Sequence, residues 1–395
     1  MKFSYFLLII SFFSYCSTKH IQIKINSDFP GGNIIVDSVT QDTVYLRPDN
    51  RDSEKPWFYW YFEVSNTDKK QVIFKFNQQN VMTTFGPAVS LDAGETWNWL
   101  FSEPSDQDYF IFNFPEVKSE VRFCMAMPYL QTTLDVFCKK YHGQDRFKTG
   151  VLCTTKQGRK VEKINILPTQ EDVRAKVLIT ARHHASEMMA DYILEGIIDE
   201  IMNGKNIDFI KDHVEFMFIP FVDKDGVEKG DQGKHRKPRD HNRDYENESI
   251  YASTGTLRKV IPAWTDGLPI VALDLHNPWV KYDNNEITYM VGSSKPNIEE
   301  EQIMFSHLLD SLQKGLLRFN KQHFMPYGSE WNTNKNYEKG WSFDMWASQL
   351  QDILFSTTLE TPYANNEGQQ VTAESARSFG NDIVRALHVY LVKKQ

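Results

Sequence analysis

The chain has 395 residues, of which 41% are hydrophobic and 13% are aromatic, a composition typical of folded globular proteins that excludes a disordered or fibrous one. Its 52 acidic and 44 basic residues give a formal net charge of −8, and neither sign forms a long block. This argues against a general nucleic-acid-binding protein, which needs a basic face for the phosphates. The length favours two domains.

The N-terminal end differs in composition from the rest. Lys2 precedes an apolar run from Phe3 to Phe13, and Cys16 follows shortly after it. The run is too short for a membrane-spanning helix, which needs about 20 residues, and fits the apolar region of a secretory signal peptide. We therefore expect residues 1–16 to be a signal peptide and the protein to be exported, to the periplasm or the cell surface. A membrane anchor or a buried strand is the alternative, and Cys16 resembles the lipidated cysteine of bacterial lipoproteins, which would attach the protein to a membrane.

Residues 17–124 have the pattern of an all-β domain. Short runs rich in β-branched and aromatic residues recur about every ten residues, with Asn, Asp, Gly or Pro between them, which predicts a β-sandwich. The runs are IQIKI (21–25), NIIVD (33–37), TVYL (43–46), WFYWYFEV (57–64), QVIFKF (71–76), TWNWLF (96–101) and YFIFNF (109–114).

After about residue 150, apolar runs alternate with helical patterns. The predicted strands are KVLIT (176–180), VEFMFIPFV (214–222), PIVALDLH (269–276) and DILFSTTLE (352–360), and the predicted helices begin near Glu187, at 298–318 and at Thr372. Alternation of this kind predicts an α/β domain whose central sheet is flanked by helices. Ligands of such sheets collect at the carboxyl ends of the strands.

Polar side chains with metal-binding and acid–base chemistry follow three of these strands. The stretch ARHHASE (181–187) contains His183, His184 and Glu187, while His276 and Glu360 each end a strand. Any one of them alone is more often a structural residue, but two histidines and a glutamate are an accepted ligand set for catalytic zinc, which leaves a fourth position for water. Spacing alone does not choose between His183 and His184, since residues i and i+4 of a helix also share a face.

Four motifs in order resemble the zinc carboxypeptidase family related to carboxypeptidase A. They are HASE (184–187), the NR pair in DHNRDY (240–245), DLH (274–276) and TLE (358–360). The similarity covers roughly residues 125–395, which we take as the catalytic domain. WFYWYFEVSN (57–66) is similar to the β-sandwich that precedes this domain in the cytosolic-carboxypeptidase branch. The resemblance implies a mixed central sheet flanked by helices, one Zn²⁺ per chain, and His184, Glu187 and His276 as its ligands.

The resemblance also implies roles for residues outside the metal set. Glu360 falls on the general base and acid, and Arg236 on the cation that stabilises the developing negative charge, with Arg239 as the competing choice. Asn242 and Arg243 fall on the pair that binds the terminal carboxylate of the substrate, and an arginine suits a carboxylate because the contact can be bidentate.

Three further residues fall on substrate-binding positions of the family. Tyr337 falls on a mobile tyrosine that caps the substrate. Phe343 and Asp344 lie where the family often sets specificity, and an inward aromatic would favour apolar ends whereas an inward aspartate would favour basic ends. The sequence does not choose between these two.

We therefore predict a zinc-dependent carboxypeptidase that hydrolyses the last amide bond of a peptide with a free carboxylate. The alternatives are a zinc amidase acting on peptidoglycan stem peptides, a deacylase of N-acyl amino acids, and a catalytically inactive binding protein. The expected partner is a peptide or another amide that carries a carboxylate, with no nucleic acid. The oligomeric state is left open.

Overall fold

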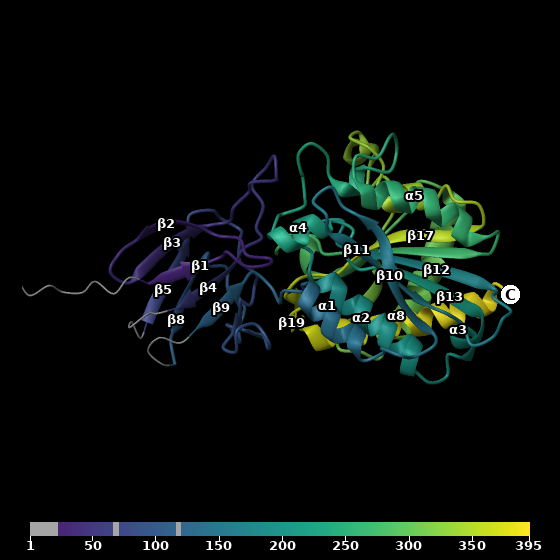
Figure 1. Cartoon of the computed structure of the whole chain (residues 1–395), viewed down its shortest axis with the longest axis horizontal. Helices are drawn as coiled ribbons and strands as arrows, with labels where there is room; N and C mark the ends of the chain where they lie inside the picture. The colour runs from purple at the N-terminus through teal and green to yellow at the C-terminus, as the bar shows by residue number, and fades with distance from the viewer. Residues whose placement is uncertain (1–22, 66–70, 116–119) are drawn as a thin grey trace, which may run out of the picture.

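The computed structural model describes residues 23–65, 71–115 and 120–395. The predicted signal peptide and Cys16 fall outside these residues. Figure 1 shows two parts, an all-β part formed by the N-terminal third of the chain and a larger part in which helices surround a sheet. Among the described residues, no helix combines the length and the apolarity that crossing a membrane would require.

The N-terminal part contains two sheets packed face to face. One has the strand order β1-β4-β9-β6-β7 and the other β2-β3-β5-β8. The strands are β1 (Lys24–Asn26), β2 (Ile35–Val39), β3 (Thr43–Arg47), β4 (Tyr61–Ser65), β5 (Gln71–Phe76), β6 (Ala88–Ser90), β7 (Asn98–Trp99), β8 (Tyr109–Asn113) and β9 (Val121–Cys124). Phe74 of the second sheet contacts Phe62 and Phe123 of the first, with ring centroids 5.6 and 5.3 Å apart, and Phe110 of the second sheet contacts Phe123 at 5.1 Å. These aromatic residues explain the apolar alternation of the sequence, because alternate positions face the other sheet.

The second part is built on a mixed sheet of eight strands in the order β10-β11-β13-β12-β14-β17-β15-β16. The strands are β10 (Phe147–Thr154), β11 (Lys160–Ile166), β12 (Ala175–Ala181), β13 (Val214–Ile219), β14 (Ile270–His276), β15 (Thr288–Val291), β16 (Phe319–Met325) and β17 (Ile353–Glu360). The four central strands β13, β12, β14 and β17 are parallel. Every residue of β12 and β14 is buried, as expected for strands that have helices on both faces. Two short strands, β18 (Asn365–Asn366) and β19 (Gln369–Gln370), form a separate pair.

Helices cover this sheet (Figure 1). They are α1 (Gln131–Lys139), α2 (Met189–Asn203), α3 (Asp208–His213), α4 (Lys224–Lys229), α5 (Ala252–Thr265), α6 (Pro296–Leu312), α7 (Phe343–Ala347) and α8 (Ala373–Lys393), with short 3-10 helices at His241–Arg243, Asp283–Glu286 and Asn334–Tyr337. The predicted N-terminus of α8 is explained by Thr372, whose side chain accepts the Ser375 N–H while Ser375 Oγ accepts the Thr372 N–H. This capping box satisfies two backbone donors that the helix leaves unpaired.

The fold class predicted from the sequence is confirmed, a mixed α/β sheet with helices preceded by all-β sheets. One helix differs from its prediction, since α6 ends at Leu312 instead of continuing to 318. Asp382 of α8 accepts the backbone N–H groups of Lys314 and Gly315, so the chain leaves the helix there and enters β16 at Phe319.

Candidate active site

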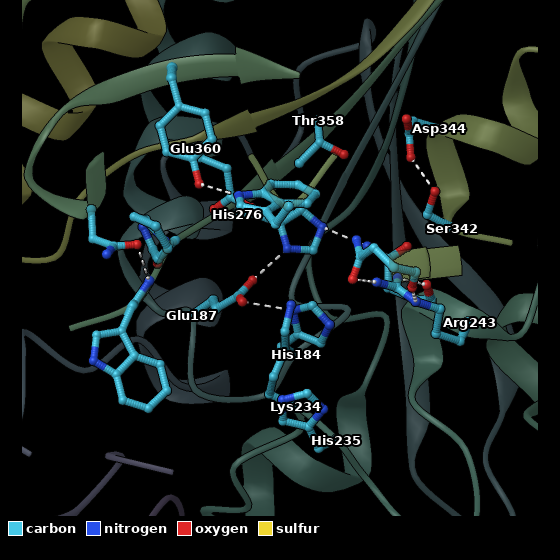
Figure 2. Close-up of a pocket in the computed structure, with 18 of the residues that line it drawn as sticks. His184, Glu187, Lys234, His235, Arg243, His276, Ser342, Asp344, Thr358 and Glu360 are labelled. Atoms are coloured by element: carbon cyan, nitrogen blue, oxygen red, sulfur yellow. Dashed lines mark hydrogen bonds and ion pairs between the residues drawn. The ribbon is translucent and has the colours of Figure 1, made fainter. Parts of the chain in front are cut away.

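The residues His184, Glu187 and His276 meet at the carboxyl ends of β12 and β14. His184 Nδ1 lies 2.7 Å from Glu187 Oε1, and His276 Nδ1 lies 2.6 Å from Glu187 Oε2. The three ligand atoms lie within 4.8 Å of one another, and Figure 2 shows the two imidazoles pointing toward the same carboxylate. Parallel strands bring these residues together, because the end of β12 and the end of β14 lie at the same edge of the sheet.

Two aspartates hold the other ring nitrogens of these histidines. Asp240 lies 3.1 Å from His184 Nε2, and Asp274 lies 2.6 Å from His276 Nε2. A carboxylate that accepts the Nε2–H bond fixes the tautomer in which Nδ1 is free to bind a metal, and it makes the imidazole a stronger ligand. Neither aspartate was predicted as a site residue, although both stand inside the motifs DHNRDY and DLH.

His183 has different partners from His184. Its Nδ1 lies 2.8 Å from Asp274 Oδ1 and its Nε2 lies 2.8 Å from the Tyr245 hydroxyl. The side chain is fully buried. Each histidine belongs to a group that could hold a metal, His183 with Asp274 and His276, and His184 with Glu187 and His276. His184 lines the cavity described below and His183 does not, which favours the predicted ligand His184.

The loop that carries His184 and Glu187 is held from inside the protein by Arg182. This arginine is only 2% exposed, and its guanidinium donates to the carbonyls of Ala185 and Tyr129 and to the Asp191 carboxylate, at 3.0, 3.0 and 2.7 Å. Its φ of 58° lies in the left-handed region, a strained backbone for a residue other than glycine, which persists only when its surroundings hold it.

Asn277 provides a second constraint on the same loop. Its side-chain oxygen accepts the N–H groups of Met189 and Ala190, the first residues of α2, and its amide donates to the Thr361 carbonyl. Asn277 thus links the start of α2 to the segments that follow β14 and β17. The three ligands and Glu360 are therefore held in a fixed arrangement.

Glu360 lies beside His276 at the end of the neighbouring strand β17. It is 6% exposed, and its Oε2 atom has no hydrogen-bond partner among the described residues. Burial raises the pKa of Glu360 to about 7, with Glu187 adding to this rise, while His276 and Lys234 oppose it. A buried carboxylate with a free oxygen and a pKa near neutrality is suited to general acid–base catalysis.

The pKa values of Glu187 and His276 move in opposite directions because the two groups are paired. Burial alone raises the pKa of Glu187, but the imidazoles of His184 and His276 outweigh burial and hold it below its ordinary value. Burial lowers the pKa of His276, but Asp274 and Glu187 outweigh it and raise the pKa well above the ordinary value. The site therefore concentrates negative charge that favours a cation.

A cavity of about 270 Å³ opens onto these residues. Asn242, Arg243 and Tyr337 line it, so the structure brings the predicted substrate-binding residues to the same site as the predicted metal ligands. The Arg243 guanidinium lies 5.3 Å from the Tyr337 ring centroid and donates to the carbonyl and side-chain oxygens of Asn336, both at 3.1 Å. Asn242 Oδ1 accepts the Phe343 N–H at 2.8 Å.

Asp344 faces the cavity and Phe343 does not, a choice that the sequence left open. Asp344 lines the cavity, together with Ser342 and Thr358, and Figure 2 shows its carboxylate directed toward the Ser342 hydroxyl. Phe343 is fully buried and packs against His183 and Tyr245. Burial raises the pKa of Asp344 and the Ser342 hydroxyl opposes this rise.

Arg236 does not line this cavity. Its guanidinium is surrounded by carboxylates, with Asp231 at 2.9 Å, Asp52 at 3.6 Å and Asp223 also in contact. Arg239 is engaged in a similar way, since it donates to Asp244 at 2.7 Å and to the Glu248 carbonyl at 3.0 Å. The geometry therefore gives no support to either arginine as the cation at the reacting carbonyl.

The cavity also contains residues that the sequence did not indicate. Lys234 and His235 line it from the loop after α4, and Trp57 lines it from the β-sandwich part. The Trp57 ring packs edge-on against Trp279 at 4.5 Å and against His235 at 5.4 Å. Burial and the adjacent Lys234 lower the pKa of His235 to about 4. The only signal in the sequence was the basic run GKHRKPR, in which no pattern distinguishes the residue that faces the cavity.

Two imidazoles and one carboxylate that converge at the edge of a cavity fit a catalytic zinc ion, which takes three such ligands and leaves a position for water. The aspartates behind the histidines support this choice. Glu360 adds a carboxylate beside this group of candidate ligands.

A family model described as zinc carboxypeptidase matches residues 137–385, more than half of the chain, and the chain belongs to this family. Human cytosolic carboxypeptidase 1 is 24% identical over 330 residues, which cover 69% of this chain and 26% of the human protein. Cytosolic carboxypeptidase 2 of Xenopus tropicalis is 21% identical over 390 residues, 85% of this chain and 38% of that protein. The chain thus spans well under half the length of these relatives.

Solved structures of bacterial metallocarboxypeptidases share the fold over nearly the whole chain. A metallo-carboxypeptidase from Burkholderia cenocepacia has a TM-score of 0.77 at 18% identity and covers 94% of this chain and 100% of its own. A metallo-carboxypeptidase from Pseudomonas aeruginosa has a TM-score of 0.75 at 19% identity, with coverage of 94% and 100%. The family model thus assigns the chain to the zinc carboxypeptidases, and these structures show that it shares their fold.

The prediction of an exported protein, periplasmic or at the cell surface, is wrong. The curated relatives that the chain matches are instead named cytosolic carboxypeptidases. The apolar run from Phe3 to Phe13 was interpreted by its length and composition alone, and these do not distinguish an export signal from other apolar N-terminal segments. Lipidation of Cys16 presupposes export and loses its basis.

Proposed function

We propose that the protein is a zinc-dependent carboxypeptidase that hydrolyses the C-terminal amide bond of peptides with a free terminal carboxylate. One observation carries this proposal. A single cavity is lined by the metal ligands His184, Glu187 and His276, by the carboxylate of Glu360 and by the guanidinium of Arg243. The three ligands and Glu360 suit the hydrolysis of an amide bond, and Arg243 suits the binding of a free carboxylate.

Zinc, when bound by His184, Glu187 and His276, supplies an activated water and polarises the scissile carbonyl. Glu360 is the group that removes a proton from the attacking water, since one of its oxygens is unpartnered and the side chain is shielded from solvent. The same carboxyl group then gives this proton to the nitrogen of the leaving amine. Its pKa near neutrality suits both steps.

The terminal carboxylate of the substrate is bound by Arg243. Asn336 fixes the guanidinium from one side through two hydrogen bonds, which leaves the arginine preorganised for a carboxylate. A charged hydrogen bond of this kind contributes roughly 1.5–3 kcal/mol. Tyr337, packed over Arg243, covers the same end of the substrate.

The side chain of the terminal residue extends toward Ser342, Asp344 and Thr358, the residues beside Arg243 in the cavity lining. Asp344 adds a carboxylate to this end. We expect acidic terminal side chains to be disfavoured there and side chains that donate hydrogen bonds to be accepted.

The test is mass spectrometry of a peptide library with mixed terminal residues, incubated with the zinc-loaded protein. Loss of single C-terminal residues, abolished by a chelator, restored by zinc and absent when the peptides are amidated, supports the proposal. Muropeptides and N-acyl amino acids are assayed in parallel. Cleavage confined to either of these would assign an amidase or a deacylase in place of a carboxypeptidase, and an inactive protein that still binds zinc would be a binding protein.

A further inference from the structure

We propose that Lys234 is a catalytic residue of this enzyme, the cation that stabilises negative charge on the oxygen of the scissile carbonyl. The inference rests on the proposed function, because it assigns a residue to that same reaction. It replaces the sequence-based assignment of this role to Arg236 or Arg239, whose guanidinium groups are occupied by carboxylates.

Lys234 is placed correctly for this role. It lines the cavity next to the metal ligand His184 (Figure 2). The lysine and arginine side chains that line the cavity, among the described residues, are Lys234 and Arg243. Arg243 is held by Asn336 at the end of the cavity proposed for the substrate's carboxylate. Lys234 is therefore the cation left for the reacting carbonyl.

The ammonium group of Lys234 is also free to interact with a substrate. Among the described residues, Lys234 contacts the β-sandwich part through its backbone carbonyl, which accepts a hydrogen bond from Ser53 Oγ at 2.9 Å. No described carboxylate forms an ion pair with its ammonium. In contrast, Arg236 contacts three carboxylates and Arg239 contacts Asp244. A half-buried lysine without a partner, facing a site rich in carboxylates, needs a functional explanation.

The backbone around Lys234 is fixed from two sides. On one side, Gly233 lies against the metal loop so closely that a Cβ atom would come within 2.1 Å of the Ala185 backbone nitrogen. The Gln232 carbonyl accepts the Ser186 N–H at 3.2 Å. Any residue other than glycine at position 233 would therefore push Lys234 away from His184.

On the other side, a loop of the β-sandwich part binds the same segment. The Asp52 carboxylate accepts the N–H groups of Gln232 and Gly233 at 3.0 and 2.9 Å, and the Glu54 N–H donates to the His235 carbonyl at 3.0 Å. The β-sandwich part thus positions the segment that presents Lys234, which gives this part a role in the active site.

The chemistry requires such a cation. When water adds to the carbonyl carbon, a new carbon–oxygen bond forms, the π electron pair moves onto the carbonyl oxygen, and the proton of the water passes to Glu360. The Lys234 ammonium donates a hydrogen bond to the oxygen as its charge grows and keeps its own proton. The bond strengthens in the transition state, so it accelerates the reaction more than it tightens substrate binding.

The test compares the zinc-loaded wild type with Lys234→Met, Lys234→Arg and the matched control Lys237→Met. Lys237 is an exposed lysine of the same segment that does not line this cavity. We expect Lys234→Met to lower kcat by roughly 10²- to 10³-fold, the usual cost of removing one such donor, with KM and zinc content nearly unchanged. Lys234→Arg should recover a substantial part of kcat, and Lys237→Met should behave as the wild type.

Affinity for a peptide phosphonate, whose charged tetrahedral group resembles the transition state, provides a readout that does not depend on turnover. Lys234→Met should weaken phosphonate binding by a factor similar to its loss of kcat, while binding of the cleaved peptide product stays unchanged. A Lys234→Met enzyme with wild-type kcat and wild-type phosphonate affinity would overturn the assignment. If the wild type cleaves no peptide at all, the proposed function itself fails, and the two outcomes are thereby distinguished.

Discussion

His276 and Glu360 lie opposite each other in the parallel pairing of β14 and β17, each as the last residue of its strand. The register therefore places a metal ligand beside the proposed general base although 83 residues separate them in sequence. The flanking strand β12 ends at the same edge and leads directly into the loop of His184 and Glu187. The architecture of the site is thus set by three adjacent parallel strands.

Replacement of the two adjacent histidines should have different effects. His184→Ala removes a ligand atom that faces Glu187, so the variant should lose zinc at equimolar metal and should lose activity. His183→Ala removes hydrogen bonds to Asp274 and Tyr245 in the core, so it should lower stability but still bind zinc. Zinc content by elemental analysis after dialysis measures both, and a zinc-free His183→Ala protein with its fold intact would contradict the assignment.

Arg182→Met should destabilise the protein strongly. The arginine is fully enclosed and paired with Asp191, and removing one member of a buried pair leaves an uncompensated charge, which costs about 3–5 kcal/mol. The free energy of unfolding in urea measures this cost. An exposed arginine with one ion pair, Arg174→Met, is the control and should change stability by less than about 1 kcal/mol.

Arg243→Met should weaken the binding of substrates that end in a free carboxylate. The loss of a charged hydrogen bond of roughly 1.5–3 kcal/mol corresponds to a tenfold to hundredfold increase in KM. C-terminally amidated peptides, which lack the carboxylate, should be poor substrates of the wild type and should be little affected further by the change. Equal losses for both peptide types would mean that Arg243 is structural.

Glu360→Gln should change the pH dependence of stability in the zinc-free protein. Since the folded protein raises the pKa of Glu360 from the ordinary 4.5 to about 7, the protonated form is favoured on folding. Its contribution to stability is complete below pH 4.5 and is lost as the pH rises to 7. Glutamine does not ionise. The free energy of unfolding of the variant should therefore exceed that of the wild type by about 3 kcal/mol at pH 8 and equal it at pH 4.

Urea unfolding of the two zinc-free proteins at pH 4 and pH 8 measures this difference. The exposed Glu338→Gln variant serves as control and should show no such pH dependence. In the zinc-loaded enzyme the same substitution should lower kcat by roughly 10²- to 10⁴-fold, because it removes the general base. A variant that retains full activity would exclude Glu360 from the mechanism.

Asp52→Ala tests whether the β-sandwich part positions the segment of Lys234. This change removes the acceptor of the Gln232 and Gly233 N–H groups, and we expect a loss of about 1.5–3 kcal/mol in stability together with a lower kcat. Asp52→Asn retains an acceptor oxygen and should recover part of kcat. Wild-type kcat for Asp52→Ala would show that the contact between the two parts has no influence on the reaction.

Much of the fold could be predicted because local sequence determines it. The apolar runs at 176–180 and 269–276 became β12 and β14, since an unbroken apolar run fits a strand covered on both faces. The strands β10 and β16 were not predicted, because their polar and exposed residues, as in FNKQHFM, give neither an apolar run nor a clean alternation.

The sequence by itself determined that an α/β domain follows a β domain and that His184, Glu187, His276 and Glu360 stand at strand ends, because periodicity and motif order are local properties of the chain. Tertiary structure alone decided which of the charged side chains that are neighbours in sequence face the cavity. Arg236 and Lys234 are two residues apart in one basic segment, yet Arg236 pairs with carboxylates of Asp52, Asp223 and Asp231 while Lys234 faces the cavity. One of these carboxylates, Asp52, comes from the distant β-sandwich part, and only the folded chain brings it to Arg236.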